Sequence, residues 1–150
     1  MIKIDSKTLE DLEFPIVLQQ VSNFCITDPG KQSVLSIMPF DDIEYIQTAL
    51  QQVKEYTASF GSDAPIPNHG FEPIFKELQL LDIENSSLDI TGFRKILSIC
   101  QTTQTLLAFF KKFEEFYIYL NQNANTISYR ANIATEIQAI FNKYGELRDD

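Results

Sequence analysis

The spacing of apolar residues in the third quarter of the chain is the feature that most constrains its fold. Side chains suited to a buried face recur there in steps of three and four, which is the period of an α-helix and not of a strand. The pattern lasts for about 28 residues and predicts a helix roughly 42 Å long. Two successive steps of three, from Leu107 to Phe113, predict a bend or an overwound turn at that point. The pattern is carried by Phe93, Ile96, Cys100, Thr103, Leu107, Phe110, Phe113, Tyr117 and Leu120.

Shorter patterns with the same period occupy most of the remaining chain. Prolines stand where helices are expected to begin or end, and the one clear loop runs from Gly61 to Gly70. No segment keeps the alternation of a half-buried strand. We therefore expect an all-α fold, an irregular multi-helix bundle of about five to seven helices with one long central helix. The shorter helices are predicted within residues 6–25, 28–38, 43–60, 71–81 and 127–144.

Length and composition fit one domain. With 150 residues, 44% of them hydrophobic, the chain is long enough to bury a core. We expect a single helical domain over residues 1–150, with the loop at 61–70 between two helical halves. In the helix within 28–38, Val34, Leu35 and Met38 should face inward. Short oxygen-bearing side chains cap helices, and they predict helix starts at Ser6 or Thr8, at Asp28, at Asp41, and at Asp89 or Thr91.

The charge balance argues against nucleic acid as a direct partner, and the short apolar runs argue against a membrane. Asp and Glu outnumber Lys and Arg by 21 to 12, and the formal net charge is −9. Because basic side chains supply most of the affinity for nucleic acid, DNA binding by this chain alone should be weak. The apolar runs are shorter than the roughly 18 residues of a membrane span, and residues 1–5 lack the apolar region of a signal peptide. We expect a cytoplasmic protein with no membrane partner.

No combination of residues typical of a catalytic, cofactor-binding or metal site stands out. His69 is the single histidine and lacks the second histidine or thiolate of a metal site, so we expect it to shape its loop together with Asn68. Cys25 and Cys100 lie in apolar helical patterns and are interpreted as buried thiols. Gly30-Lys31 lacks the spaced glycines of a phosphate loop. Adjacent carboxylates point apart on a helix, which favours solvated surface for Asp41-Asp42, Glu114-Glu115 and Asp149-Asp150.

Aromatic residues around Lys111-Lys112 are the clearest sign of an interface. Four of them nearly encircle the predicted long helix: Phe109, Phe116, Tyr117 and Tyr119. Either this part of the helix is buried on most sides, or some of it faces a partner. We favour the partner, which need not be nucleic acid because Glu114-Glu115 offsets the two lysines.

Seven segments at helix boundaries and packing positions stand out when they are taken together. The segments are Thr8-Leu9-Glu10-Asp11-Leu12-Glu13-Phe14, Val17-Leu18-Gln19-Gln20-Val21, Thr27-Asp28-Pro29-Gly30-Lys31, Met38-Pro39, Ile66-Pro67-Asn68-His69-Gly70-Phe71, Ile90-Thr91-Gly92-Phe93-Arg94-Lys95-Ile96 and Tyr144-Gly145-Glu146-Leu147. They resemble the beginning of the second bacterial branch of MutS-like proteins, the branch that ends in an Smr nuclease domain. The similarity extends over nearly all 150 residues but only the N-terminal fraction of a family member.

The resemblance implies that the chain is a structural segment of a larger, multidomain protein. Such proteins begin in a helical core or lever region, which a DNA clamp, a MutS-type ATPase and the Smr domain follow. The family is associated with branched DNA, with restraint of recombination and, in some bacteria, with stalled ribosomes. The chain would then be a fragment that is not an enzyme and holds no cofactor, with ATP and Mg in the missing ATPase domain. Its partners would be the clamp and ATPase domains of its own chain, DNA through the full-length protein, and, as an open option, a second copy in a homodimer.

A second hypothesis belongs to a different class. The chain would be a free-standing helical adaptor that binds a partner protein through the aromatic face near Phe109 and Phe116. A reading frame that continues past Asp150 into a GxxxxGK[ST] loop would favour the MutS-like hypothesis over the adaptor.

Overall fold

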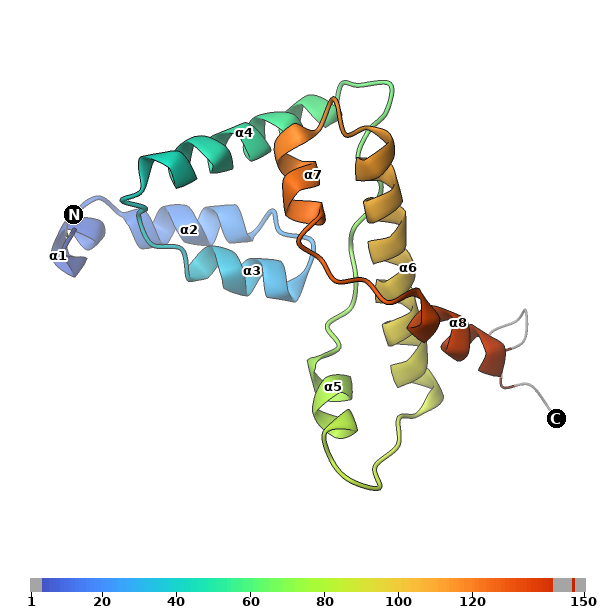
Figure 1. Cartoon of the computed structure of the whole chain (residues 1–150). Coiled ribbons are helices and arrows are strands. Elements are labelled where there is room, and N and C mark those ends of the chain that lie inside the picture. Colours follow the sequence, from blue (N-terminus) through green and yellow to red (C-terminus); the bar gives the residue numbers. More distant parts are fainter. Residues whose placement is uncertain (1–3, 142–146, 148–150) are drawn as a thin grey trace. The chain divides into compact units, whose positions relative to one another are not determined.

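The fold is all-α, as the apolar spacing predicts. The computed structural model describes residues 4–141 and 147, and in this part of the chain it contains eight helices and no strand (Figure 1). One isolated antiparallel bridge joins Phe141 to Leu147. The helices are α1 (Ser6–Asp11), α2 (Phe14–Ser22), α3 (Asp28–Leu35), α4 (Ile43–Ser59), α5 (Phe75–Leu81), α6 (Ile90–Lys112), α7 (Ile118–Ala124) and α8 (Ala131–Ile140).

The chain divides into two compact units. The first is Met1–Val53 and the second is Lys54–Asp150, so the division falls within α4. The loop predicted at 61–70 is non-helical and lies inside the second unit. That the whole chain forms one domain stays a prediction.

The capping residues of α1, α3 and α4 lie one residue or more from the predicted ones. Asp5, not Ser6 or Thr8, caps α1 by accepting the Thr8 N–H at 2.7 Å. Thr27, whose backbone is extended, caps α3 by accepting from Gly30 at 3.2 Å, and Asp28 is the first helical residue. Asp42, not Asp41, accepts the N–H groups that open α4. The types of side chain that cap these helices were predicted correctly. Their exact positions were not, because the capping residue is the one whose backbone is extended just before the helix.

The predicted inward face of α3 is wrong for two of its three residues. α3 packs against α2, and Val34 is half-buried, but Leu35 and Met38 are exposed. The apolar stripe of α4 is also exposed at Ile43 and Leu50. Spacing specified that these helices have an apolar face, but it did not specify a neighbour that covers it.

The second unit holds the main core, which lies between α6 and α8. Asp89 caps α6 by accepting the Gly92 N–H at 2.7 Å, which settles the choice between Asp89 and Thr91. α6 has 23 residues and ends at Lys112, and the chain turns over residues 113–117 before α7 begins. The predicted long helix is therefore interrupted just after the expected bend. Leu88, Ile96, Ile137 and Phe141 are buried together, and Ile74, Phe93, Leu97 and Cys100 pack against them. The predicted end of the last helix at Tyr144 and Gly145 lies outside the described residues.

Candidate structural site on the long helix

An ion-pair cluster holds α5 against the first turns of α6. The Lys95 ammonium lies 3.1 Å from the Glu77 carboxylate and 3.6 Å from that of Glu72. Gly92 permits the close approach, because a Cβ at that position would lie 3.3 Å from the Glu77 Cγ. The Glu77 side chain is only 13% exposed. Because the Glu77 carboxylate is partly buried, water weakens its attraction to Lys95 less than it weakens an ordinary surface ion pair. This contact therefore fixes the position of α5 against α6.

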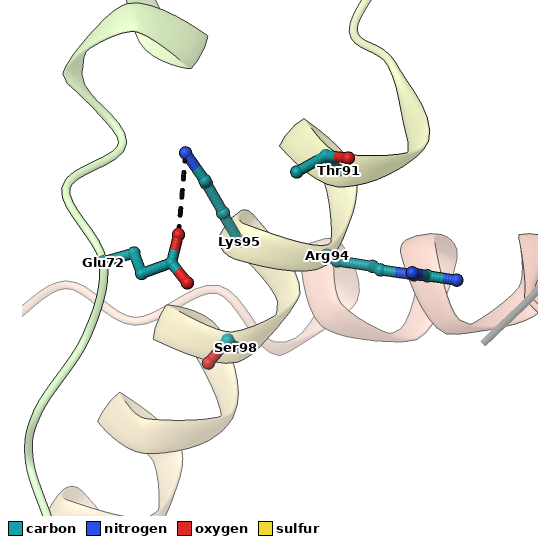
Figure 2. A pocket seen from close by; sticks show the side chains of 5 residues that line it. All are labelled: Glu72, Thr91, Arg94, Lys95 and Ser98. Carbon is teal, nitrogen blue, oxygen red and sulfur yellow. Dashed lines mark ion pairs between the residues drawn. The ribbon is translucent and has the colours of Figure 1, made fainter. Parts of the chain in front are cut away.

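A small pocket of about 230 Å³ lies beside this cluster, lined by Glu72, Thr91, Arg94, Lys95 and Ser98. In Figure 2 the Lys95 ammonium points toward Glu72, whereas Arg94 extends away from the pair. With Glu77 included, two cations and two carboxylates balance, so the pocket offers little net attraction to an anionic ligand. We interpret it as part of the contact between α5 and α6.

The acid–base properties of the cluster predict its pH dependence. A hydrogen bond from its own backbone N–H, together with Lys95, lowers the pKa of Glu77 below its ordinary 4.5. Glu77 in turn raises the pKa of Lys95 above 10.5. A lowered carboxyl pKa stabilises the fold above 4.5, and this contribution is lost as pH falls through the folded-state pKa. A raised ammonium pKa stabilises the fold below 10.5, and this contribution is lost as pH rises through the folded-state pKa.

We therefore expect an NMR titration to place the Glu77 carboxyl below the pKa of an exposed glutamate. In the variant Lys95→Met this pKa should rise toward 4.5, because the ammonium that favours the charged carboxylate is gone. Lys76→Met removes an exposed lysine beside Glu77 in sequence and serves as the control. A Glu77 pKa that is the same in the wild type and in Lys95→Met would contradict the proposed pairing.

A second cluster fixes the turn that follows α6. The Glu55 carboxylate, on α4, accepts the backbone N–H groups of Tyr119 and Leu120 at 3.0 and 2.9 Å. It thereby caps α7 from 64 and 65 residues away in sequence. The Tyr117 hydroxyl donates to the Ala64 carbonyl at 2.8 Å, and Tyr117 is only 5% exposed. Both ends of α6 are therefore held by polar contacts to other elements of the second unit.

His69 has the loop-shaping role that we expected. Its Nδ1 lies 3.0 Å from the Pro67 carbonyl oxygen, and Asn68 accepts the Gly70 N–H at 3.0 Å. The structure adds a contact that the sequence did not indicate, between His69 Nε2 and the Tyr56 hydroxyl at 3.2 Å. The loop is thus tied to α4 as well as to itself.

The aromatic residues near Lys111-Lys112 pack largely on one another. Ring centroids of Phe109 lie 5.5 Å from Phe110, 4.8 Å from Phe113 and 5.4 Å from Tyr117. Phe116 is the exception, since 75% of it is exposed. Lys111 pairs with Glu114 at 2.7 Å. The suggested interface around this helix is therefore reduced to Phe116 and its immediate surroundings.

The remaining candidates take structural positions. Cys100 packs against the core, where burial raises the pKa of its thiol, and Cys25 is half-buried at the end of α2. Asp28 pairs with Lys31 at 3.4 Å. Across residues 4–141 and 147, no group of three or more His, Cys, Asp or Glu side chains is placed to hold a metal ion. Within those residues, no helix is long and apolar enough to cross a membrane.

Comparison of the sequence with known proteins finds relatives of one kind. The endonuclease MutS2 of Leuconostoc citreum (strain KM20) is 24% identical over 152 residues, which cover 98% of this chain. The endonuclease MutS2 of Leuconostoc mesenteroides is 23% identical over 98% of the chain, and that of Lactobacillus johnsonii is 25% identical over 54%. The chain is similar to MutS2. No family model matches the sequence, and no solved structure matches the fold.

The similarity concerns one segment of those proteins. The chain spans 19% of the length of the two Leuconostoc relatives and 10% of the Lactobacillus johnsonii relative. The MutS-like relationship expected from helix boundaries is therefore supported at low identity and over nearly the whole chain.

Proposed function

We propose that this chain is the structural core or lever segment of a MutS-like DNA-binding ATPase of the Smr-containing branch. The observation that carries the proposal is the match over 98% of the chain to proteins named endonuclease MutS2. In this role the segment does not catalyse a reaction and holds no cofactor. ATP, Mg and nuclease activity belong to the remainder of the protein, which acts in the cytoplasm on branched DNA or on stalled ribosomes.

The geometry of α6 supports a mechanical role. Its 23 residues span about 35 Å. Lys95 and Glu77 hold its first turns, while Tyr117 and Glu55 hold the turn beyond its end. A helix fastened at both ends moves as a unit when either end is displaced, because the intervening backbone hydrogen bonds resist bending. Such a helix could carry a displacement between an ATPase and a DNA clamp.

The acidic composition also supports a role for this chain that does not involve direct contact with DNA. With a net charge of −9, the chain repels phosphate, so DNA contacts would come from other parts of the protein. We expect the chain itself to bind duplex DNA only weakly at physiological salt and to hydrolyse no ATP. Fluorescence anisotropy over a salt series measures the first property, and phosphate release measures the second. Tight, salt-sensitive DNA binding by the chain alone would refute a purely mechanical role.

Coupling between DNA binding and ATP hydrolysis in the full-length protein provides the direct test. The downstream reading frame should encode a GxxxxGK[ST] loop, and the complete product should hydrolyse ATP faster with branched DNA. Glu55→Ala should reduce this stimulation while the hydrolysis rate without DNA stays unchanged, because Glu55 fixes the turn between α6 and α7. Glu115→Ala, at an exposed position in that turn, is the matched control. Unaltered stimulation in Glu55→Ala would contradict transmission through this helix.

The adaptor hypothesis remains the alternative, favoured by the exposure of Phe116. It predicts that Phe116→Ser abolishes binding to a partner protein. It also predicts a reading frame that lacks the nucleotide-binding loop, which the MutS-like proposal requires.

A further inference from the structure

An open apolar groove follows the second half of α6 and lies apart from the polar clusters described above. One hollow of about 410 Å³ lies between α6 and α7, and another of about 300 Å³ lies between α6 and the segment that leads into α8. Thr103 and Ile127 line both hollows, which therefore adjoin. From Ile99 to Phe110 the groove follows α6 for roughly 17 Å, or about three helical turns.

The lining side chains leave one side of the groove open to water. Of the apolar residues that line it, only Ala124 is buried, whereas Ile127 and Ile133 are exposed. An acyl chain or a small apolar ligand laid there would keep much of its own surface in water, so hydrophobic burial would hold it weakly. A helix instead turns one apolar face to the groove and keeps its polar face in water. The half-buried lining residues are Ile99, Cys100, Leu106, Leu107, Phe110 and Leu120.

The elements that form the groove also favour a helical occupant. α6 and α7 form the walls of the larger hollow. An extended peptide gains its affinity by pairing with the free edge of a sheet, and the part of the chain that the structure describes contains no strand. A further helix can pack along α6 and α7 as neighbouring helices pack, with the side chains of one between those of the other.

The smaller hollow offers hydrogen-bond donors that have no acceptor. Arg130 lines it, is exposed, and forms no ion pair with a carboxylate of the described residues. The Tyr129 hydroxyl is buried beside it without a hydrogen-bond partner there, which is unfavourable. α8 begins at the next residue, its first N–H groups are not capped by a described side chain, and a helix start favours negative charge. An occupant with a carboxylate at this point is therefore complementary to the groove.

We propose that the α6 groove binds an amphipathic helix of another protein, with apolar residues in steps of three and four and with Asp or Glu near one end. The apolar face of this helix covers Leu107, Phe110 and Ile127, and its carboxylate pairs with Arg130. Phe116, on which the adaptor hypothesis rests, lines neither hollow. The inference thus concerns a different surface, and it does not depend on the proposed lever function.

Selection from a displayed library of helical peptides about 15 residues long, with the wild-type chain as bait, tests the proposal. We expect the enriched peptides to share apolar residues at positions i, i+3 or i+4 and i+7, and an acidic residue near one end. A fluorescein-labelled copy of the most enriched peptide then serves as the probe, and fluorescence anisotropy measures its Kd. No enrichment, or enriched peptides that lack this pattern, would overturn the proposal.

Substitutions in the groove locate the binding site of the probe. Ile127→Glu should raise its Kd by about a hundredfold and Arg130→Glu by about tenfold. Ile118→Glu, at a similarly exposed position outside the groove, and Lys76→Glu, at an exposed position on α5, are the matched controls and should leave the Kd unchanged. Circular dichroism verifies the helical content, and Ile133→Glu replaces Ile127→Glu if the latter unfolds. Equal binding to the wild type and to the groove variant would overturn the proposal.

Charge reversal identifies the group that meets the acidic end of the probe. A second probe carries lysine in place of its acidic residues. It should bind the wild-type chain about tenfold more weakly than the first probe does, and it should prefer Arg130→Glu to the wild type. If the two probes rank the two chains in the same order, the carboxylate does not pair with Arg130, and the proposed complementarity is wrong.

Two further measurements distinguish the other occupants of the groove. We expect the complete product of the reading frame to bind the first probe as tightly as this chain does. If it does not bind, another segment of the same polypeptide fills the groove, and the proposal fails. It also fails if sedimentation equilibrium shows that the wild-type chain associates with itself and that Ile127→Glu abolishes this association, because a second copy then fills the groove.

Discussion

Ile137→Ala is expected to lower the free energy of unfolding of the second unit by about 3 kcal/mol, within the usual range for truncating a buried isoleucine. Ile137 on α8 is 7% exposed and belongs to the cluster that joins α6 to α8. The substitution removes apolar contacts and leaves a cavity that neighbouring side chains fill only partly. Urea unfolding monitored by circular dichroism measures the change, with the slope of the transition expected to stay the same.

Ile140→Ala on the same helix provides the control. Ile140 is 42% exposed, so the same chemical truncation should cost less than about 1 kcal/mol. Unfolding of the two variants at the same urea concentration would contradict the packing of α8 on α6 through Ile137. Phe93 is only partly buried against the same cluster, so its replacement should cost less than truncating a fully buried phenylalanine.

Glu55→Ala is expected to destabilise the turn beyond α6 by about 2 kcal/mol, which is typical of hydrogen bonds to a charged group. The substitution leaves the N–H groups of Tyr119 and Leu120 without the carboxylate that accepts them. It also removes a negative charge from the N-terminal end of α7, where the helix dipole favours it. Amide hydrogen exchange should quicken across α7 and more weakly in α8, because the contact is local to the end of α6.

Glu55→Gln separates charge from hydrogen bonding in this contact. The amide keeps one acceptor oxygen, so it should retain part of the protection that Glu55→Ala loses. Glu115→Ala removes an exposed carboxylate from the neighbouring turn and should leave the exchange of Tyr119 and Leu120 unchanged. Equal protection in Glu55→Ala and in the wild type would show that the carboxylate does not cap α7.

The accuracy of sequence-based prediction depended on how far apart along the chain the interacting residues lie. The Asp89 cap of α6 and the Asn68 contact to Gly70 join residues two or three positions apart. Residue chemistry predicted Asp89 as one of two possible caps, and it predicted that Asn68 bonds the local backbone. The cap of α7 was not predicted, because the sequence indicates only that Glu55 is a polar residue within a helix. The end of α6 at Lys112 was also missed, since the apolar rhythm continues through Phe113 and Tyr117 while the backbone turns.

The exposed faces of α3 and α4 show a further limit. Spacing correctly predicted the helices, yet Leu35, Ile43 and Leu50 are exposed. A repeat of three and four residues is a property of one helix alone, whereas burial depends on a second element that lies against it.

By itself, the sequence determined that this protein is helical and acidic, and it indicated a MutS-like relationship through residues at helix boundaries. These properties arise from backbone preferences and hydrogen bonds within about four residues, and from the sum of charges. Only the tertiary structure decided that Glu55 caps α7, that Tyr117 anchors the loop at Ala64, and that Lys95 joins α5 to α6. Those contacts join residues whose separation along the chain carries no local signal, so packing alone brings them together.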